Sequence, residues 1–381
     1  MQPSAWMALG GLVLGLAGFG RLRLLGHSTS EGPDSRPGAG GPFPVDTGRR
    51  VRIIVPARNE ASNLPGLLSD LRGEVSHRVT VTVVDDHSTD RTREVVALFD
   101  FVDLVSAPPL PPGWTGKSWA CHVGSAGAGT GDVLIFLDAD VRVSPDALDD
   151  LLRERSRRGG LVSVQPRHEA VRPVERLSAL FNVVAVIGIG AGWPDPGGLF
   201  GPVLCVSAAE YRSIGGHSAV RGEVIEDVAL GRHAVASGLP VTVFGGGDRF
   251  AFRMYPDGLG QLVEGWTKNF ASGARSARWR ATACVCALIM ALCSIGGQLA
   301  AAALGSGSWS ISAVAVLSAA AVGTLGSMFR RVGNFGPGTA LAFPLLVAFF
   351  VVVFGRSVYR TAIRRDVSWR GRSIPIGGAL K

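Results

Sequence analysis

The chain has 381 residues, 47% of them hydrophobic, and a formal net charge of +8. This length allows one large domain and a smaller part, and a basic chain can bind nucleic acid or anionic lipid. The arginines flank apolar segments, and no basic platform with interleaved aromatic residues occurs. We therefore exclude nucleic acid as a partner and expect membrane lipids.

The first apolar segment, residues 3–20, carries no charge, and the first basic residues, Arg21 and Arg23, follow it. A cleaved secretory signal has the reverse order, with basic residues first. We predict that residues 1–25 form an uncleaved membrane anchor with its N-terminus outside, a buried soluble helix being the alternative. Residues 26–50 are rich in Gly, Pro and Ser and predict a flexible linker.

A catalytic domain is expected over residues 51–269, where three strand-like runs end in polar clusters. The runs and their clusters are 52–55 before Pro56 and Glu60, 79–84 before Asp85 and Asp86, and 133–137 before Asp138 and Asp140. Helical stretches alternate with these runs, which predicts an α/β fold with a mostly parallel sheet and helices on both faces. The carboxyl ends of parallel strands meet at one edge, where nucleotides bind.

The helical stretches of this domain are expected at residues 61–71, 91–98 and 145–157. Ser144-Pro145-Asp146 is typical of a helix start with Pro in the first turn. The uncharged run 177–192 is too short to cross a bilayer, so we expect a core or interfacial helix there.

Asp138 and Asp140 stand one residue apart at the end of a buried strand. Paired carboxylates supply two hard oxygen ligands, and a divalent cation held by them can meet a diphosphate. A solvated turn before the next helix is the alternative. Lysine usage gives a separate signal, because Lys117, Lys268 and Lys381 are the only lysines among 38 basic residues. Lys117 follows a Gly-containing loop and is a candidate phosphate contact, chance being the alternative.

Three more apolar segments, residues 281–304, 309–329 and 338–355, are candidate membrane spans. We expect transmembrane helices over residues 270–356 and a basic tail over 357–381. With the N-terminus outside, four crossings would leave this tail outside as well, against the positive-inside tendency. Either one segment is re-entrant or interfacial, or the anchor does not span. Pro337 and Pro344 make the last segment the main suspect.

The ordered motifs resemble family 2 glycosyltransferases of the GT-A fold. They are Val55-Pro56-Ala57-Arg58-Asn59-Glu60, then Val84-Asp85-Asp86-His87-Ser88, then Leu137-Asp138-Ala139-Asp140, then Glu226-Asp227. The resemblance implies a nucleotide-sugar donor, a divalent cation (Mg²⁺ or Mn²⁺) and inversion at the anomeric carbon.

The resemblance also assigns roles on the donor side. It implies that Glu60 and Asp86 contact the nucleobase and ribose, with Pro56 and Asp85 beside them. An Asx-turn or a helix cap is the alternative for the aspartates. It further implies that Asp138 and Asp140 hold the metal, Asp138 also facing the nucleotide sugar.

On the acceptor side, the family pattern implies that Asp227 is the general base and that Glu226 supports it. An inverting displacement needs a carboxylate there to remove the proton of the nucleophile. An acidic first helical turn, favoured by the helix dipole, is the alternative. If the acceptor is a carboxylate, already ionised at pH 7, Asp227 would mainly position it.

One motif departs from the processive members of the family, which carry Gln-x-x-Arg-Trp. Here Trp266 matches, but Gly265 stands in place of the Arg. Arg253 or Lys268 could take over its diphosphate contact, and Trp266 is either on the acceptor side or a packing residue. The departure favours transfer of a single sugar over polymer synthesis.

Within the family, Trp114-Thr115-Gly116-Lys117 and Trp266-Thr267-Lys268-Asn269 are similar to the membrane-bound branch of carotenoid-acid glycosyltransferases. This resemblance implies a multi-pass hexosyltransferase of the cell membrane, with a cytoplasmic catalytic domain, a UDP-hexose donor and a lipid-like or carotenoid-acid acceptor. A processive polysaccharide synthase and a non-catalytic nucleotide-sugar-binding scaffold are the alternatives.

Overall fold

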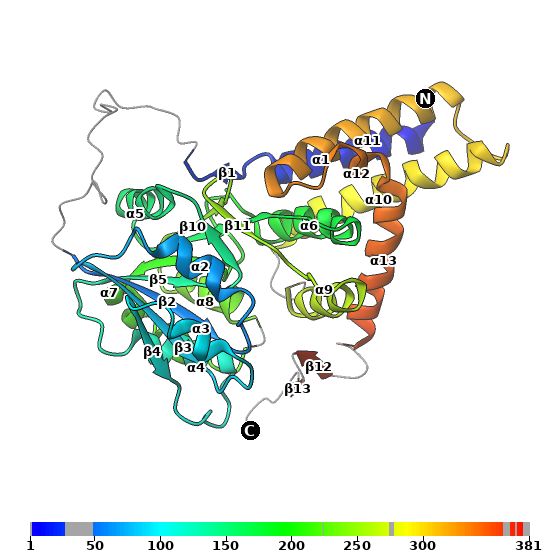
Figure 1. The fold of residues 1–381 in the computed structure, drawn as a ribbon. Coiled ribbons are helices and arrows are strands. Elements are labelled where there is room, and N and C mark those ends of the chain that lie inside the picture. Colours follow the sequence, from blue (N-terminus) through cyan, green and yellow to red (C-terminus); the bar gives the residue numbers. More distant parts are fainter. Residues whose placement is uncertain are drawn as a thin grey trace. The chain divides into compact units, whose positions relative to one another are not determined.

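The computed structural model describes residues 2–26, 49–223, 225–273, 278–360, 366–369 and 372–375. Most of the predicted linker and much of the basic tail lie outside these ranges. The chain divides into two units (Figure 1). The sheet unit comprises Arg23–Arg167 and Pro194–Phe252, and the helical unit comprises Met1–Leu22, His168–Trp193 and Arg253–Lys381. The predicted catalytic domain, residues 51–269, therefore contributes to both units.

An eight-stranded sheet forms the centre of the sheet unit, in the order β1-β10-β7-β9-β5-β2-β3-β4. Its strands are β1 (Arg23–Leu24), β2 (Val51–Ala57), β3 (Val79–Asp85), β4 (Val102–Ser106), β5 (Val133–Leu137), β7 (Leu161–Gln165), β9 (Val203–Ser207) and β10 (Val241–Gly245). All neighbours pair in parallel except β9, which runs antiparallel to both β5 and β7. The mostly parallel sheet predicted from the sequence is confirmed.

The helices of the sheet unit are α2 (Leu64–Leu71), α3 (Thr92–Val96), α4 (Gly116–Ser125), α5 (Ala147–Arg158), α7 (Ala208–Ser213), the 3₁₀ helix η2 (Gly216–Val220) and α8 (Glu226–Ala236). Helix α5 begins later than predicted. Asp146 precedes it in the left-handed conformation, with φ of 62°, so Pro145 lies in the preceding turn and not in the helix.

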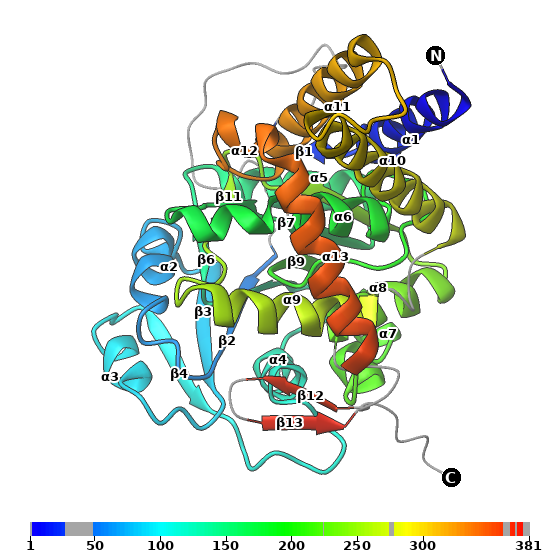
Figure 2. The same ribbon diagram turned by 90° about the vertical axis from the view of Figure 1, so that its right-hand side faces the viewer.

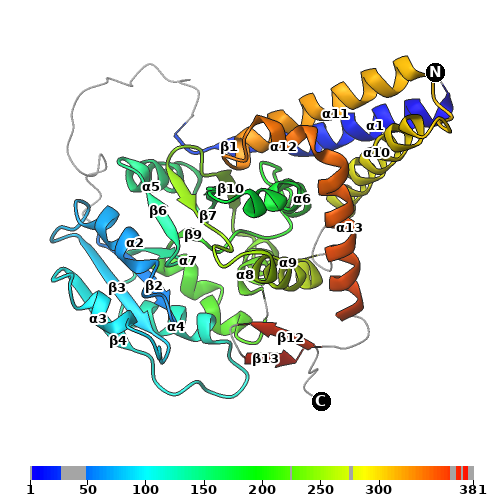
Figure 3. The same cartoon turned by 45° about the vertical axis from the view of Figure 1, so that its right-hand side comes forward.

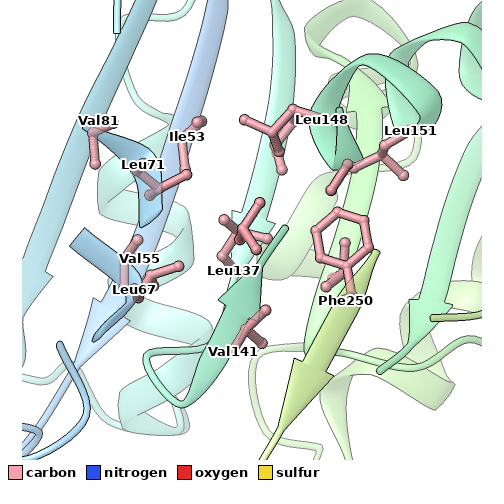
Figure 4. Packing of buried hydrophobic residues seen from close by; sticks show 14 of the residues in the cluster. Ile53, Val55, Leu67, Leu71, Val81, Leu137, Val141, Leu148, Leu151 and Phe250 are labelled. Carbon is pink, nitrogen blue, oxygen red and sulfur yellow. The ribbon is translucent and has the colours of Figure 1, made fainter. Parts of the chain in front are cut away.

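Side-chain alternation along the strands explains why helices cover both faces of the sheet. Leu67 and Leu71 of α2 join the core with Ile53 and Val55 of β2 (Figure 4). Successive strand residues point to opposite faces, so Ile54 faces the other way. There it meets Gly124 of α4, where an added Cβ would lie 2.5 Å from the Ile54 side chain.

A second, three-stranded sheet has β11 (Phe250–Phe252) between β6 (Val141–Val143) and β8 (Arg167–His168). Strands β6 and β11 pair antiparallel, and Val141 and Phe250 join the same core. The strand β8 (Arg167–His168) is the point at which the chain passes from the sheet unit into the helical unit.

The helical unit contains α1 (Pro3–Phe19), the 3₁₀ helix η1 (Pro173–Ser178), α6 (Ala179–Ile189), α9 (Leu259–Gly273), α10 (Trp279–Ala303), α11 (Ile311–Val332), α12 (Pro337–Leu341), α13 (Phe343–Tyr359) and a hairpin of β12 (Asp366–Trp369) and β13 (Arg372–Pro375) (Figure 2). Within the described ranges, α10 and α11 are long and apolar enough to cross a membrane, whereas α1 and α13 are shorter.

Two predictions about the apolar segments can be compared with these helices. The run 177–192 begins at the end of η1 and forms α6, and α6 is buried along most of its length, as a core helix is. The predicted span 338–355 is divided into α12 and α13, because the helical conformation is interrupted at Ala342 just before Pro344.

Candidate active site

The carboxyl ends of β2, β3 and β5 lie together at one edge of the sheet. The parallel register pairs Ala57, the last residue of β2, with Asp85, the last residue of β3. Strand β5 lies on the other side of β2 and ends at Leu137, directly before Asp138. The sheet therefore brings three of the predicted polar clusters to one place, as expected for a nucleotide-binding edge.

Asp85 and Asp86 are both buried, with exposed fractions of 1% and 3%. The Ser88 N–H donates to Asp85 Oδ1 over 3.2 Å, so Asp85 holds the turn after β3, which fits the Asx-turn alternative. Asp86 Oδ2 lies 3.3 Å from Arg58 Nη1. The next residue, His87, has φ of 56°, a left-handed conformation that glycine adopts most readily. The nucleotide-binding roles of both aspartates stay predictions.

Glu60 and Pro56 come from β2 and the loop after it. Pro56 stands in register with Val84 of β3, and both it and Glu60 are half-buried. Asn63 Nδ2 donates to Glu60 Oε2 over 2.8 Å, and the Glu60 N–H donates to Thr92 Oγ1 over 2.8 Å. These bonds fix the Glu60 backbone and orient its carboxylate.

The carboxylates of Asp138 and Asp140 carry concentrated negative charge. Burial, together with the charges of Asp138 and Glu60, raises the pKa of Asp140 to about 7. In the described part of the chain, no group of three or more His, Cys, Asp or Glu side chains could hold a metal by itself. Two carboxylates with a shared negative potential nevertheless fit Mg²⁺ or Mn²⁺, which commonly completes its coordination with substrate phosphates and water.

Lys117 joins the strand ends to the next element of the site. It lies in the first turn of α4, whose N-cap residue Thr115 accepts from Ser118 N–H. Its ammonium lies 2.7 Å from Asp138 Oδ1 and 3.3 Å from Glu226 Oε1. Burial acts to lower the Lys117 pKa, but the negative charges of these carboxylates and of Asp227 outweigh burial and raise it. Lys117 is therefore a permanent cation here.

Asp227, in the first turn of α8, is held by backbone donors. The Gly201 N–H donates to Asp227 Oδ2 over 2.7 Å, and the Val228 N–H donates to Oδ1 over 2.9 Å. Burial, together with the charge of the adjacent Glu226, raises the pKa of Asp227 to about 6. A carboxylate with such a pKa suits a general base near neutral pH.

The antiparallel strand β9 explains how Asp227 reaches the end of β5. Because β9 runs against β5, its first residue Val203 pairs with Leu137. The loop before β9 is therefore at the carboxyl end of β5, where the Asp138 N–H donates to Pro202 O over 2.9 Å. The preceding residue is Gly201, which binds Asp227. Sequence reasoning missed this Gly201-Pro202 link, since a Gly-Pro pair predicts only a turn.

Arg253, Trp266 and Lys268 belong to the helical unit. Arg253 Nη2 lies 2.7 Å from Oε1 of the fully buried Glu175. Trp266 is only 3% exposed and donates from Nε1 to Ser178 Oγ over 3.0 Å, as a packing residue does. Lys268 is half-buried on α9. The predicted diphosphate and acceptor contacts of these three residues stay predictions.

The structure accounts for Gly265, which departs from the processive motif. A Cβ added at Gly265 would lie 2.1 Å from Cε1 of Tyr255, whose ring also packs on Trp266 with centroids 5.9 Å apart. Tyr255 itself has φ of 60°, a strained conformation for a bulky residue. The tyrosine ring thus occupies the space in which an arginine side chain would begin.

Comparisons with known proteins agree with these motifs. The family model described as Glycosyl transferase family 2 matches residues 52–179. The chain is 34% identical over 338 residues to 4,4'-diaponeurosporenoate glycosyltransferase of Staphylococcus aureus (strain USA300), covering 86% of this chain and 89% of the relative. It is 33% identical over 340 residues to the protein of the same name from Staphylococcus haemolyticus (strain JCSC1435), covering 87% and 90%.

Among solved structures, the fold is similar to the mannosyltransferase PcManGT from Pyrobaculum calidifontis in complex with GDP-Man and Mn²⁺. The TM-score is 0.53 at 20% identity, over 92% of this chain and 98% of that chain. The GT-A fold expected from the motifs is confirmed.

Proposed function

The chain belongs to glycosyltransferase family 2 and is a single-sugar glycosyltransferase, and from this premise we propose its donor, its acceptor and its metal. The donor is a nucleoside-diphosphate hexose, with UDP as the expected nucleotide. The acceptor is a lipid-like molecule with a polar end, of the carotenoid-acid type named in the Staphylococcus relatives. The sheet unit is cytoplasmic, and the helices of the helical unit hold the enzyme in the cell membrane.

One arrangement carries this proposal. Lys117 lies between Asp138, at the end of β5, and Glu226, at the start of α8. Asp227 follows Glu226 directly. Within one small region the chain therefore offers carboxylates suited to a cation, a permanent positive charge suited to a diphosphate, and a carboxylate with a pKa near 6. A sugar–diphosphate bond could be cleaved and a nucleophile deprotonated in the same place.

The donor side is assigned as follows. Asp138 and Asp140 would hold Mg²⁺ or Mn²⁺, which stabilises negative charge on the departing diphosphate when bound. The Mn²⁺ in the mannosyltransferase complex supports this choice of metal. Lys117 contributes positive charge to the same leaving group. Asp86 and Glu60 contact the nucleoside, and Pro56 and Asp85 lie beside them.

On the acceptor side, Asp227 takes the proton of an acceptor hydroxyl as its oxygen bonds to the anomeric carbon and the carbon–diphosphate bond breaks. The hydrogen bonds from Gly201 and Val228 fix its orientation for this transfer. An acceptor carboxylate has no proton to lose at pH 7, so Asp227 would then only orient it. Glu226, held by Lys117, keeps the helix start in place.

The experiment supplies the purified protein with labelled UDP-glucose, UDP-galactose or GDP-mannose and a native lipid extract, and identifies the product by mass spectrometry. We expect one hexose on an apolar acceptor from one UDP-sugar, and loss of transfer when EDTA removes divalent cations. Transfer unaffected by EDTA would refute the metal assignment. Long polysaccharide products would refute single transfer to a lipid, a result that the Tyr255 ring at Gly265 argues against.

A further inference from the structure

Three helices of the helical unit pack side by side, and glycines determine how closely α1 approaches α10. A Cβ added at Gly11 would lie 2.7 Å from Ala291 Cβ, and one added at Gly15 would lie 2.8 Å from the Leu288 side chain. Gly18 faces Cys284 in the same way, at 3.0 Å. As residue numbers rise along α1 they fall along α10, so the two helices are antiparallel. Such small-residue contacts are typical of helices packed in membranes.

Helix α11 runs parallel to α1, as contacts at both ends show. Near the start of each helix, Trp309 Nε1 donates to Ser4 Oγ over 2.9 Å. Near their ends, the Arg331 guanidinium lies 5.5 Å from the centroid of the Phe19 ring and donates to Leu22 O. The bundle of α1, α10 and α11 therefore has two distinct ends, here called the hairpin end, where α10 leads into α11, and the arginine end.

Charge is confined to one end of this bundle. The arginine end carries Arg21, Arg278, Arg280, Arg330 and Arg331. Residues 2–20 and 281–329 contain no charged side chain, so the hairpin end has none. At 1.5 Å per residue, α10 and α11 are about 37 and 33 Å long, enough for a hydrocarbon core of about 30 Å. By the positive-inside tendency, the arginine end is cytosolic and the hairpin end lies across the membrane.

Helix α13 differs from these three, although with 17 residues it is as long as α1. Ser357 Oγ donates to Thr267 O of α9 over 2.8 Å, and the Phe350 ring packs on Phe270 of α9 at 5.6 Å. Helix α9 carries Glu264 and Lys268, which are costly to place in hydrocarbon. Figures 1 and 3 show α13 running across the direction of α10 and α11. Helix α13 is thus attached to polar structure and not aligned with the bundle.

The exposed face of α13 and the end of α12 is nevertheless apolar. Leu345 and Val352 of α13 are 71% and 69% exposed, and their spacing of seven residues places them on one helical face. Leu341, at the end of α12, is 68% exposed. The first charge after them is Arg356, in the last turn of α13, followed by Arg360. An apolar face that ends in arginines suits contact with lipid, and the direction of α13 across the bundle suits a helix that lies in the membrane interface.

We propose that α13 lies in the plane of the membrane on its cytosolic side and does not cross it. The Leu345 and Val352 face enters the boundary between headgroups and acyl chains, and Arg356 and Arg360 contact anionic phospholipid phosphates. This proposal rests on the membrane location given under the proposed function. It leaves three crossings, α1, α10 and α11, and returns the arginine-rich tail to the cytosol, which removes the conflict that four crossings create.

Depth measurements can test this proposal with a matched pair of positions. Val352, midway along α13, and Met290, midway along α10, are similarly exposed, at 69% and 61%. Val352→Cys and Met290→Cys would be made in full-length protein in which Cys284, Cys286 and Cys293 are replaced by alanine. Each would be labelled with the NBD fluorophore and reconstituted in vesicles of phosphatidylcholine and phosphatidylglycerol that contain lipids spin-labelled at a shallow or a deep acyl carbon.

We expect the label at 352 to be quenched at least twofold more by the shallow lipid and the label at 290 more by the deep lipid. Deep quenching at 352, or no quenching by either lipid because protein covers the face, would overturn the proposal. A second measurement needs no cysteine change. A fluorescent protein fused after Lys381 should fold and fluoresce, and an alkaline phosphatase fused there should be inactive, whereas an active phosphatase would overturn the assignment. Neither measurement depends on sugar transfer, so a wrong donor or acceptor would leave both results unchanged.

Discussion

In the sheet unit a glycine makes room for a reactive carboxylate, whereas in the helical unit a glycine makes room for another helix. A Cβ at Gly201 would lie 2.8 Å from Asp227 Oδ2, and a Cβ at Gly11 would lie 2.4 Å from Ala287 O. The first contact orients a charged group at the edge of an apolar core. The second brings two uncharged helices together. Substitutions in the two units should therefore separate loss of chemistry from loss of packing.

The buried polar groups of the two units differ in the same sense. In the sheet unit, Asp140 and Asp227 have pKa values that burial raises towards neutrality, which costs stability and is a common feature of active sites. In the helical unit, Glu175 is fully buried, but its pKa is lowered: burial acts to raise it, and the hydrogen bonds from Arg253 and the backbone outweigh burial. The sheet unit thus keeps carboxylates whose charged form is destabilised by burial. The helical unit instead stabilises the charged form of its buried carboxylate with hydrogen-bond partners.

The largest effect is expected for Asp227→Asn. Loss of the base should reduce kcat by about 10²- to 10⁴-fold for a hydroxyl acceptor, since general-base catalysis contributes a factor of this size. The variant should stay folded, because an amide oxygen can still accept from Gly201 N–H. Initial rates and circular dichroism would be measured together. Asp100→Asn is the control, because its carboxylate in the same unit is 91% exposed. Equal rates for Asp227→Asn and wild type with a hydroxyl acceptor would remove Asp227 from the mechanism.

A second substitution tests the helical unit alone. Gly11→Leu should destabilise it by about 1–3 kcal/mol, the usual cost of overpacking, because the new side chain meets the α10 backbone. Gly10→Leu is a close control, since an added Cβ there has no heavy atom within 4 Å. Thermal unfolding in detergent would be compared for the two variants. Equal melting temperatures would show that α1 does not pack on α10 through this face.

The sequence predicts the strand ends of the sheet unit better than it predicts their convergence. Apolar runs that end at Asp85 and Asp138 are local signals, and they give the parallel strands and the nucleotide-binding edge. The contact of Asp227 with Gly201 depends on β9 running antiparallel to β5, which no local pattern reveals. Likewise, Gly265 is visible as a departure from a motif, but the Tyr255 ring that fills its place comes from ten residues earlier, through a strained backbone.

In the helical unit the sequence predicts apolar segments but not their directions. Pro344 signals an interruption near the start of α13, and the structure places it in the first turn of that helix. Length alone does not separate α1 from α13. Their neighbours do, because α1 packs along α10, which is uncharged from Ala281 onward, whereas α13 binds the polar helix α9. These packing partners are far apart in the sequence, so a hydropathy profile cannot predict them.

The smallest effect concerns the pH dependence of Asp227, and it links chemistry to stability. Because its pKa in the free folded enzyme is about 6, kcat/KM for a hydroxyl acceptor should fall about fivefold between pH 6 and pH 5 and level off above pH 7. Between the ordinary value of 3.8 and about 6, the folded state binds more protons than the unfolded state. Stability therefore falls as pH rises through this window, and the loss persists at pH 7.

Asp227→Asn cannot ionise, so it should be more stable than wild type at pH 7, by on the order of 1 kcal/mol after allowance for partial exposure. At pH 4 this difference should disappear. Denaturant unfolding at both pH values measures it, with Asp100→Asn expected to match wild type throughout. A variant that loses transfer and whose stability advantage over wild type develops between pH 4 and pH 6 would identify Asp227 as a group retained for chemistry. A stability difference independent of pH would mean that Asp227 has an ordinary carboxylate pKa in the folded enzyme.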